Sequence, residues 1–318
     1  ITLENPDVII CNPKCSFPTL WSLAFDRPQI ILSPVPYVIH YVKGHAHIGF
    51  GRNHGKWINK LSYWISNFGL SKTICKAAHS LPKRFQFSRK VIHERLLQSK
   101  MIYTVSPVLF PRPDTWPEHV QVVGYHMISY EEQGSLRSEV QQFLNTHDKI
   151  LFLTFGSMVN SNPDEVSESI YSVLELLQIP VIVNTASGGL VPLESYINNP
   201  LFLFTKYINY DAILPKVYAI IHHGGSGTTH TALKYGLPSM IIPHVIDQFM
   251  WNRLLHQQGV APMGMSISKL SDKNFKAAVL ELMNNEAHKN KALKIAGRMK
   301  ADEEQWQDNR VLTIVDKL

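Results

Sequence analysis

A run of eight residues, His222 to Thr229, shows the clearest chemical pattern in the chain. It reads His-His-Gly-Gly-Ser-Gly-Thr-Thr and joins an apolar run at 217–221 to an expected helix at 228–235. Its glycines let a ligand approach the backbone closely, and amides at a helix N-terminus have no partner inside the helix. The helix dipole adds positive potential at the same place. The run therefore predicts an anion site whose natural ligand is a diphosphate.

Other nucleotide-binding motifs do not fit this run. It lacks the G-x-G-x-x-G pattern with a following ribose-binding acid, which argues against NAD, and it lacks the G-x-x-x-x-G-K-[ST] pattern of P-loops. Taken alone, the run leaves one alternative open, a glycine-rich turn with two incidental histidines.

Two further turns favour a ligand site. Phe155-Gly156-Ser157 ends the apolar run 150–155 and precedes an expected helix. Asp247 and Gln248 follow the apolar run 239–242, and a carboxylate beside a carboxamide can both accept from and donate to sugar hydroxyls. Because open α/β sheets bind ligands outside the carboxyl ends of their strands, these turns can face one ligand. For Asp247 the alternative is a simple helix N-cap.

The elements that must position these turns alternate between strand and helix. Short apolar runs predict buried strands, and amphipathic segments predict helices. In the second half we expect strands at 150–155, 180–184, 201–204, 217–221 and 239–242, and helices near 161–177, 228–235, 247–257, 272–284, 286–300 and 303–317. In the first half we expect strands at 7–11, 29–32, 101–104 and 120–123. This alternation predicts parallel strands in doubly wound α/β domains.

The segment 43–99 of the first half has helical periodicity. Its apolar residues fall on one helix face, and they are Trp57, Ile58, Leu61, Trp64, Ile65 and Phe68. The residues that fall on the other face are Lys56, Asn59, Lys60 and Asn67. The region 111–145 is rich in Pro, Glu and Gln, so we expect it to connect two domains.

Composition excludes several classes of protein. The chain has 318 residues, 45% apolar and 18% charged, which excludes disorder, collagen and coiled coil and predicts about two domains. It contains no uninterrupted apolar stretch of about 18 residues, so we expect no membrane-spanning helix. Its three cysteines lack zinc-site spacing and make a poor disulfide framework, which favours reduced thiols in the cytoplasm.

The net charge of +6 belongs to one half of the chain. Residues 1–145 hold 16 Lys/Arg and 9 Asp/Glu, which gives +7, whereas residues 146–318 hold 15 and 16, which gives −1. From Arg27 to His93 there are 11 basic residues and no acid. Three interpretations are open: a solvated helical face over the core, contact with an anionic membrane surface through 43–93, and nucleic-acid binding. Because no nucleic-acid motif accompanies the charge, the membrane is favoured over nucleic acid.

Taken in order, these motifs resemble the nucleotide-sugar glycosyltransferases of family 1, which have the GT-B fold, and more narrowly their sterol and antibiotic-aglycone branch. The resemblance runs from about Asp7 to Leu318. The pieces that carry it are Pro6-Asp7-Val8-Ile9-Ile10, Ser106-Pro107, Pro113-Asp114-Thr115-Trp116-Pro117, Gly124-Tyr125, Thr154-Phe155-Gly156-Ser157-Met158, His222 to Thr229, and Asp247-Gln248-Phe249-Met250-Trp251.

The resemblance implies two Rossmann-like, doubly wound α/β domains that face a cleft. They are an acceptor-side domain with its linker at 1–145 and a nucleotide-sugar donor domain at 146–302. A last helix at 303–318 is expected to cross back to the first domain. Since the chain begins near the fourth strand of the family's N-terminal domain, the resemblance also implies that the acceptor-side domain is incomplete, with roughly 90–100 residues absent by that comparison.

The resemblance assigns roles to residues of the donor domain. The implied contacts of the donor diphosphate are His223, Gly225, Ser226, Gly227, Thr228 and Ser157. Asp247 and Gln248 would bind the transferred sugar. Tyr207 and Ile208 would lie beside the nucleotide base, at a position where many family members carry Trp.

The implied reaction is inverting transfer of a hexose, expected to be glucose, from a UDP-sugar to a hydroxyl of a lipophilic acceptor such as a sterol. The UDP-sugar would be a co-substrate, with no cofactor and, since no D-x-D pair occurs, no metal. Two alternatives stay open: a noncatalytic subunit that binds nucleotide sugars, and a nucleotide-sugar epimerase of the same general fold. The expected location is the cytoplasm, peripheral to a membrane surface.

The resemblance does not assign a general base within this sequence. In the family the base is a histidine on a loop after the first N-terminal strand. Because the chain begins near the fourth strand, the base is expected upstream of Ile1, and no catalytic residue is named. The chain is therefore expected to be either a partial enzyme that lacks its catalytic base or an incomplete record of a longer sequence.

Overall fold

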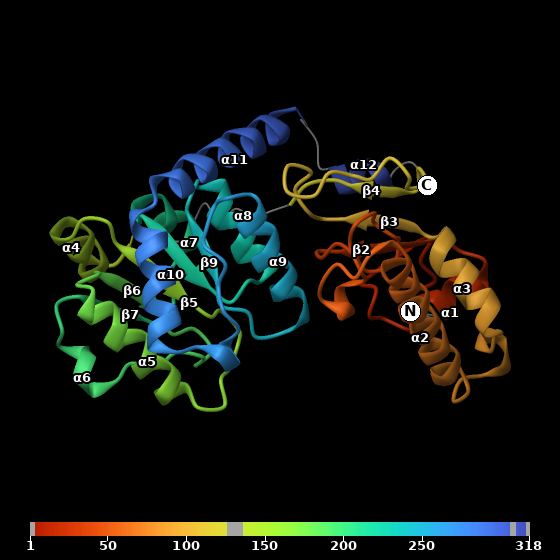
Figure 1. Cartoon of the computed structure of the whole chain (residues 1–318). Helices are drawn as coiled ribbons and strands as arrows, with labels where there is room; N and C mark the ends of the chain where they lie inside the picture. Colours follow the sequence, from red (N-terminus) through yellow and green to blue (C-terminus); the bar gives the residue numbers. More distant parts are fainter. Residues whose placement is uncertain (1–3, 126–135, 306–309, 316–318) are drawn as a thin grey trace. The chain divides into compact units, whose positions relative to one another are not determined.

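The computed structural model describes residues 4–125, 136–305 and 310–315, which form two compact units (Figure 1). Unit 1 comprises 1–126 together with 303–318, and unit 2 comprises 127–302. Each unit is built on one sheet of parallel strands with helices packed around it. The expected α/β fold class is therefore confirmed.

Unit 1 has a four-stranded sheet in the order β1-β2-β3-β4. Its strands are β1 (Ile9–Cys11), β2 (Gln29–Ser33), β3 (Lys100–Tyr103) and β4 (Val120–Val122), and all pairs are parallel. All four lie at the strands expected from the sequence. The long helices of this unit are α1 (Phe17–Phe25), α2 (Lys56–Ala78) and α3 (Arg89–Gln98). Helix α1 was not expected, and it begins with proline in its first turn and ends at Asp26 in a left-handed conformation.

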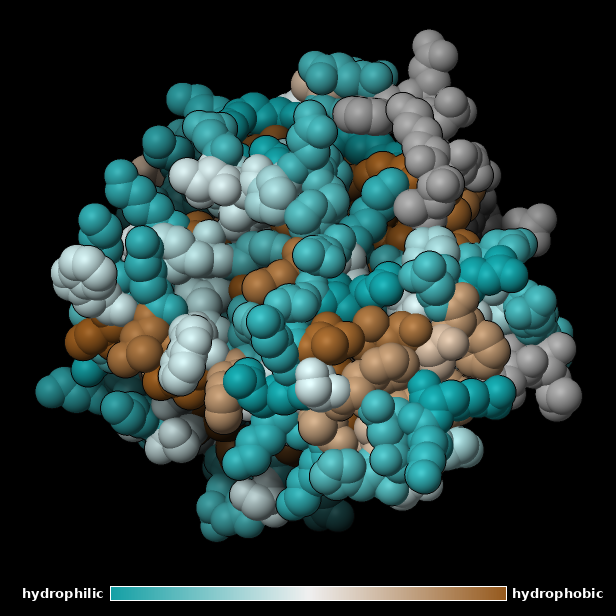
Figure 2. Space-filling view, turned by 90° about the vertical axis from the view of Figure 1, so that its right-hand side faces the viewer, coloured by the Kyte–Doolittle hydropathy of each residue, from teal (hydrophilic) through white to brown (hydrophobic). Residues whose placement is uncertain are grey.

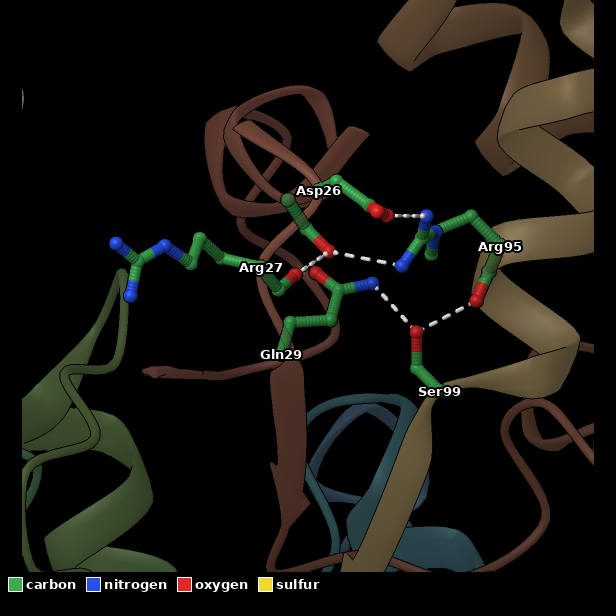
Figure 3. Close-up of polar contacts among 6 residues, drawn as sticks. Asp26, Arg27, Gln29, Arg95 and Ser99 are labelled. Atoms are coloured by element: carbon green, nitrogen blue, oxygen red, sulfur yellow. Dashed lines mark hydrogen bonds and ion pairs between the residues drawn. The ribbon is translucent and has the colours of Figure 1, made fainter. Parts of the chain in front are cut away.

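A polar network ties the end of α1 to β2 and α3 (Figure 3). The Arg95 guanidinium of α3 lies 3.5 Å from the Asp26 carboxylate at the end of α1. The Ser99 hydroxyl donates to the Arg95 carbonyl at 2.5 Å and accepts from the buried Gln29 amide at 2.7 Å. These bonds fix α3 and the end of α1 against the start of β2.

The described part of the last helix, α12 (Arg310–Val315), packs on the sheet of unit 1. Arg310 donates to the Val123 carbonyl at 3.0 Å, and the Lys100 ammonium donates to the Ile314 carbonyl at 3.2 Å. Two of its valines and Ile314 pack against the small apolar cluster of Ile30, Ile102 and Val123. The C-terminal segment thus groups with the first part of the chain.

Unit 2 has a five-stranded parallel sheet in the order β7-β6-β5-β8-β9. The strands are β5 (Leu151–Thr154), β6 (Val181–Asn184), β7 (Phe202–Thr205), β8 (Ala219–His222) and β9 (Ser239–Ile241). The helices are α4 (Ser138–Thr146), α5 (Pro163–Leu176), α6 (Glu194–Ile197), α7 (Tyr210–Ile213), α8 (Ser226–Lys234), α9 (Ile246–Gln257), α10 (Asp272–Asn284) and α11 (Glu286–Glu304). Every strand expected in this half is present.

Helices cover both faces of this sheet, so its strands are apolar on both sides. Leu151 and Leu153 of β5 pack in the larger core with α5 and α10, whereas Phe152 between them packs in a second core. Helix α4 belongs to that second core through Val140 and Phe143. The dividing point between the units therefore lies at 126/127 rather than at the expected 145/146, because α4 buries its apolar face in unit 2.

Helix α2 exposes its apolar face and buries its polar face, the reverse of an ordinary surface helix. Its apolar residues Trp57 and Trp64 are 78% and 61% exposed, whereas Asn59 and Asn67 are buried. The face with helical apolar periodicity is thus not laid over the core. No helix in the described residues is long and apolar enough to cross a bilayer. The cysteines Cys11, Cys15 and Cys75 are free thiols.

Candidate donor site

The five strands of unit 2 end side by side at one edge of the sheet. Thr154 of β5 is in register with Asn184 of β6 on one side and with His222 of β8 on the other. Thr205 and Ile241 extend the same row to β7 and β9. All five residues are buried, and the turns that follow them carry the residues singled out from the sequence. The parallel sheet therefore gathers these turns at its carboxyl edge, as expected.

Helix α8 begins at this edge directly after two glycines. Gly225 is its N-cap residue, and the first helical bond runs from the Thr229 amide to the Gly225 carbonyl at 2.9 Å. The amides of Gly227 and Thr228 therefore have no carbonyl partner within the helix. Ser226, Gly227 and Thr228 are half-buried, so a ligand can reach this first turn. With the positive end of the helix dipole behind it, the turn can hold an anion.

His223 lies between two glycines from different turns. A Cβ on Gly156 would come 2.8 Å from its Cε1 atom, and a Cβ on Gly225 would come 2.5 Å from its Nε2 atom. Gly156 also has a φ of +55°, which favours glycine. Both glycines are therefore required for the imidazole to sit at this place. The ring therefore lies between the turn after β5 and the turn after β8. Ser157, which follows Gly156 in the sequence, is exposed.

Three histidines at this edge each have a buried ring nitrogen without a partner among the described residues. These atoms are Nε2 of His222, Nδ1 of His223 and Nε2 of His244. The His222 Nδ1 atom accepts from the Gly224 amide at 3.1 Å, so its Nε2 carries the proton. Buried polar atoms in native proteins normally have partners, so unpaired ones at a strand edge point to a ligand.

Burial keeps these histidines neutral near pH 7. It lowers the pKa of His223 to about 4, with His244 contributing as a second cause. It also lowers the pKa of His222 and of His244. Neutral rings can donate from one nitrogen and accept at the other, so they can orient a diphosphate without adding a fixed charge.

A cavity of about 500 Å³ opens at the ends of β5, β6 and β7. Its lining residues are Gly156, Asn184, Ala186, Ser187, Lys206, Tyr207, Ile208 and Asn209. The volume lies within the range of small-ligand pockets, about 300–1,000 Å³. Gly156 both lines this cavity and lies beside His223, so the cavity adjoins the turn that precedes α8. The structure thus brings Tyr207 and Ile208 to the same site as His223.

The sequence pattern did not identify Asn184 and Lys206 as part of this site. Asn184 accepts from the Ala186 amide at 3.2 Å and so shapes the cavity wall, while Lys206 supplies a cation. The Tyr210 hydroxyl lies 3.1 Å from the Thr154 hydroxyl and 3.3 Å from the Asn184 amide, which holds the wall from behind. Strand-end polar residues were the signal that could have revealed Asn184.

Asp247 and Gln248 lie in the first turn of α9 and differ in environment. Asp247 is half-buried, whereas Gln248 is 4% exposed. The Gln248 carboxamide oxygen accepts from the amides of His244 at 2.6 Å and Val245 at 3.1 Å. Its nitrogen points at the Met158 sulfur, 3.4 Å away. The Gln248 side chain therefore caps the start of α9. The N-cap residue of this helix is Val245, so Asp247 is not the N-cap that the sequence left open as an alternative.

No three His, Cys, Asp or Glu side chains within 4–125, 136–305 and 310–315 come together as metal ligands would. The described side chains at the site include the hydroxyls of Ser157 and Thr228, neutral histidines, Lys206, Asn184, Asp247 and Gln248.

The catalytic base expected upstream of Ile1 lies outside the described residues. The first described residue is Glu4, and Ile1 itself precedes it. The position of the base therefore stays a prediction from the family resemblance, and the donor site is described without it.

Known proteins are similar to this chain in sequence and in fold. Residues 200–306 match the family described as erythromycin biosynthesis protein CIII-like, C-terminal domain. A sterol 3-beta-glucosyltransferase of Arabidopsis thaliana is 30% identical over 184 residues, 58% of this chain and 30% of that protein. Another, of Komagataella phaffii, is 26% identical over 315 residues, 94% of this chain and 25% of that protein. The chain thus spans about a quarter to a third of these relatives.

A solved structure shows the same architecture across both units. The glycosyltransferase of kitacinnamycin covers 95% of this chain with a TM-score of 0.69 at 15% identity, and the chain covers 74% of it. This likeness shows the GT-B fold. In sequence and in fold, the chain is similar to the family 1 glycosyltransferases. The resemblance to the sterol glucosyltransferase branch of this family, on which the sequence analysis relied, is confirmed.

Proposed function

We propose that this glycosyltransferase transfers a hexose, glucose in the first instance, from a UDP-sugar to a hydroxyl of a lipophilic acceptor. One observation carries the proposal: the cavity lined by Tyr207 and Ile208 is also lined by Gly156, and Gly156 lies directly beside His223, which precedes the first turn of α8. A nucleotide in the cavity therefore places its diphosphate at a helix N-terminus, where anions are favoured.

The donor would bind with its base in the cavity and its diphosphate at α8. In the proposed arrangement His223, the amides of Gly225, Ser226 and Gly227, and the Thr228 hydroxyl hold the diphosphate. Ser157 adds a contact from the turn after β5. Tyr207, which is 77% exposed, can close over the base as a stacking surface. Lys206 lies in the same wall and offers its charge to the donor phosphates or ribose.

The chemical step we propose inverts the anomeric centre and uses no metal. The acceptor hydroxyl gives its proton to a general base, which the described residues do not assign, as its oxygen attacks the anomeric carbon. The bond from that carbon to the diphosphate oxygen breaks, and UDP leaves. The first turn of α8 stabilises the charge that develops on the leaving diphosphate. Asp247 would accept hydrogen bonds from the sugar hydroxyls. Because the Gln248 oxygen already caps α9, only its amide nitrogen is available to the sugar.

The acceptor class rests on the relatives. The relatives from Arabidopsis thaliana and Komagataella phaffii are both named sterol 3-beta-glucosyltransferases. We propose a sterol or another apolar aglycone with one free hydroxyl. Such acceptors partition into membranes, so the same proposal places the enzyme in the cytoplasm and peripheral at a membrane surface.

Binding and turnover test the proposal separately. Isothermal titration of the 318-residue chain with UDP-glucose and with UDP is expected to show saturable binding of both. A second assay mixes UDP-glucose with sterol and phenolic acceptors and follows UDP release and glycoside formation. Absence of nucleotide binding would overturn the donor site. Binding without turnover would favour a noncatalytic subunit or a base upstream of Ile1, and an epimerised nucleotide sugar would favour an epimerase.

A further inference from the structure

The outward side of α2 is an exposed apolar surface. Its members, called here the α2 outer face, are Trp57, Ile58, Leu61, Trp64 and Ile65, which are between 43% and 78% exposed. Figure 2 shows that brown apolar groups lie among teal hydrophilic ones on the face of the molecule that it presents. Isolated exposed apolar residues are common, but five on one helix face mark an interaction surface.

The opposite face of α2 is fixed to unit 1 by polar contacts. The Asn67 amide donates to the Ile39 carbonyl at 2.9 Å. The Ser62 hydroxyl accepts from the His47 amide at 2.8 Å, and Asn59 accepts from the His54 amide at 2.9 Å. Turning the helix to bury its tryptophans would break these buried bonds. The orientation that exposes the apolar residues is therefore specified by the sequence.

Basic residues continue and flank the α2 outer face. Lys72 and Lys76 lie four and eight residues beyond Phe68, so they occupy the same helix face toward its C-terminal end, and both are exposed. The Arg89 guanidinium lies 4.4 Å from the centre of the Phe68 ring, and the Lys56 ammonium lies 5.7 Å from that of Trp57. No acidic residue occurs in the sequence between Asp26 and Glu94.

We propose that the α2 outer face docks on an anionic lipid bilayer. Tryptophan and aliphatic side chains bordered by lysine and arginine are the composition of a helix lying in a membrane interface. Acidic lipids attract each nearby lysine or arginine, whereas a second copy of this acid-free surface would meet like charge. The proposal names a surface for the peripheral contact included in the proposed function, and it does not depend on the donor chemistry.

Co-sedimentation with vesicles of phosphatidylcholine, with and without phosphatidylserine, tests the proposal on the whole chain. The double variant Trp57→Glu/Trp64→Glu is expected to bind anionic vesicles about tenfold or more weakly than the unaltered protein. The matched control is Leu176→Glu/Ile197→Glu, which replaces two apolar residues of unit 2 that are also more than half exposed, and it should bind as before. Equal loss in both variants, or in neither, overturns the proposal.

Charge and depth give two further readouts. The variant Lys72→Glu/Lys76→Glu should weaken binding by about fivefold or more for each lysine, and added salt should weaken binding of the unaltered protein.

Brominated lipids should quench tryptophan fluorescence, and this quenching should fall in Trp57→Phe/Trp64→Phe. Salt-insensitive binding, or a dimer that dissociates in Trp57→Glu/Trp64→Glu without vesicle binding, contradicts the proposal. Titration with UDP should be unchanged in every α2 variant, so failure here is distinct from failure of the donor site.

Discussion

The donor edge of unit 2 and the α2 outer face of unit 1 depart from ordinary burial in opposite ways. The donor edge buries polar side chains, among them His222 and His223, and leaves ring nitrogens without partners in the described structure. The α2 outer face exposes large apolar side chains, among them Trp57 and Trp64. Each departure costs folding free energy, so each is best explained by a ligand that the folded chain meets later.

The two regions also differ in how tightly they are built. At the donor edge, two glycines leave room for a single ring, and an added methyl group would collide with it. On α2 the outward tryptophans meet solvent, and buried polar contacts of the inner side hold the helix to unit 1. Tight packing suits a small ligand of fixed shape, whereas an open face suits a fluid surface. Changes at the first region should therefore cost more than changes at the second.

The largest effect we predict is on stability at low pH. Burial lowers the pKa of His40, His223 and His230 to about 4 each, whereas in the unfolded chain they return to the ordinary value of 6.5. The unfolded chain then binds protons that the folded chain does not as pH falls below 6.5. Stability is complete above that value and is lost toward pH 4, by up to about 1.4 kcal/mol per pH unit for each histidine.

Urea unfolding at several pH values between about 7.5 and 5 measures this slope. The variant His223→Gln should reduce the slope, and Trp64→Ser on the α2 outer face should leave it unchanged. A stability that is flat across this range, or a slope that His223→Gln does not alter, would contradict the assignment of a buried neutral ring.

The next effect is on donor affinity. In Gly225→Ala the new methyl group would lie 2.5 Å from the His223 Nε2 atom, so either the ring or the first turn of α8 must move. We expect UDP to bind at least about tenfold more weakly, because an anion cradle depends on close backbone approach. Isothermal titration provides the measurement. The matched control, Gly297→Ala, adds a methyl group in open space on α11 and should leave affinity unchanged. Equal affinities for the two variants would remove His223 from the site.

A smaller effect separates the two roles of Gln248. In Gln248→Ala the amides of His244 and Val245 lose their acceptor, which should cost about 1–2 kcal/mol of stability, as for other helix caps. The variant Gln248→Glu keeps an acceptor oxygen and should retain most of that stability. If Gln248 also donates to the sugar, Gln248→Glu should weaken UDP-glucose binding and spare UDP. Chemical unfolding and titration with both ligands distinguish these outcomes.

The position of the turns at the candidate donor site could be predicted from the sequence because their signals are local. The turns that contain Gly156 and Gly225 follow apolar runs and mark where the two strands stop. Parallel pairing of the strands then brings these turns together. The two histidines follow from their place at the end of β8. The capping role of Gln248 could not be predicted, because it depends on the path of the chain from Ile241 to Val245. Lys206 was missed because one lysine after a strand carries no periodic signal.

The orientation of α2 and the existence of helices α1 and α4 could not be predicted from the sequence. Periodicity identifies the apolar face of α2, but tertiary bonds to Asn59 and Asn67 decide which face is buried. Helix α4 lies in a region whose composition is typical of a connection, and only its contact with the second core reveals it. Helix α1 is short and nearly uniformly apolar, so it lacks the alternation of an amphipathic helix.

The smallest effect we predict is on α2 itself, and it tests whether the α2 outer face is open in the isolated chain. Trp64 is 61% exposed, so Trp64→Ser should change the free energy of unfolding by no more than about 0.5 kcal/mol. The matched control is Trp21, which is 1% exposed, where Trp21→Ala should cost about 3–5 kcal/mol. A cost above about 1.5 kcal/mol for Trp64→Ser would mean that another part of the chain already packs on this face. If Trp64→Ser leaves the free energy of unfolding nearly unchanged and Trp57→Glu/Trp64→Glu binds anionic vesicles more weakly, these tryptophans contribute to membrane binding and not to the stability of the fold.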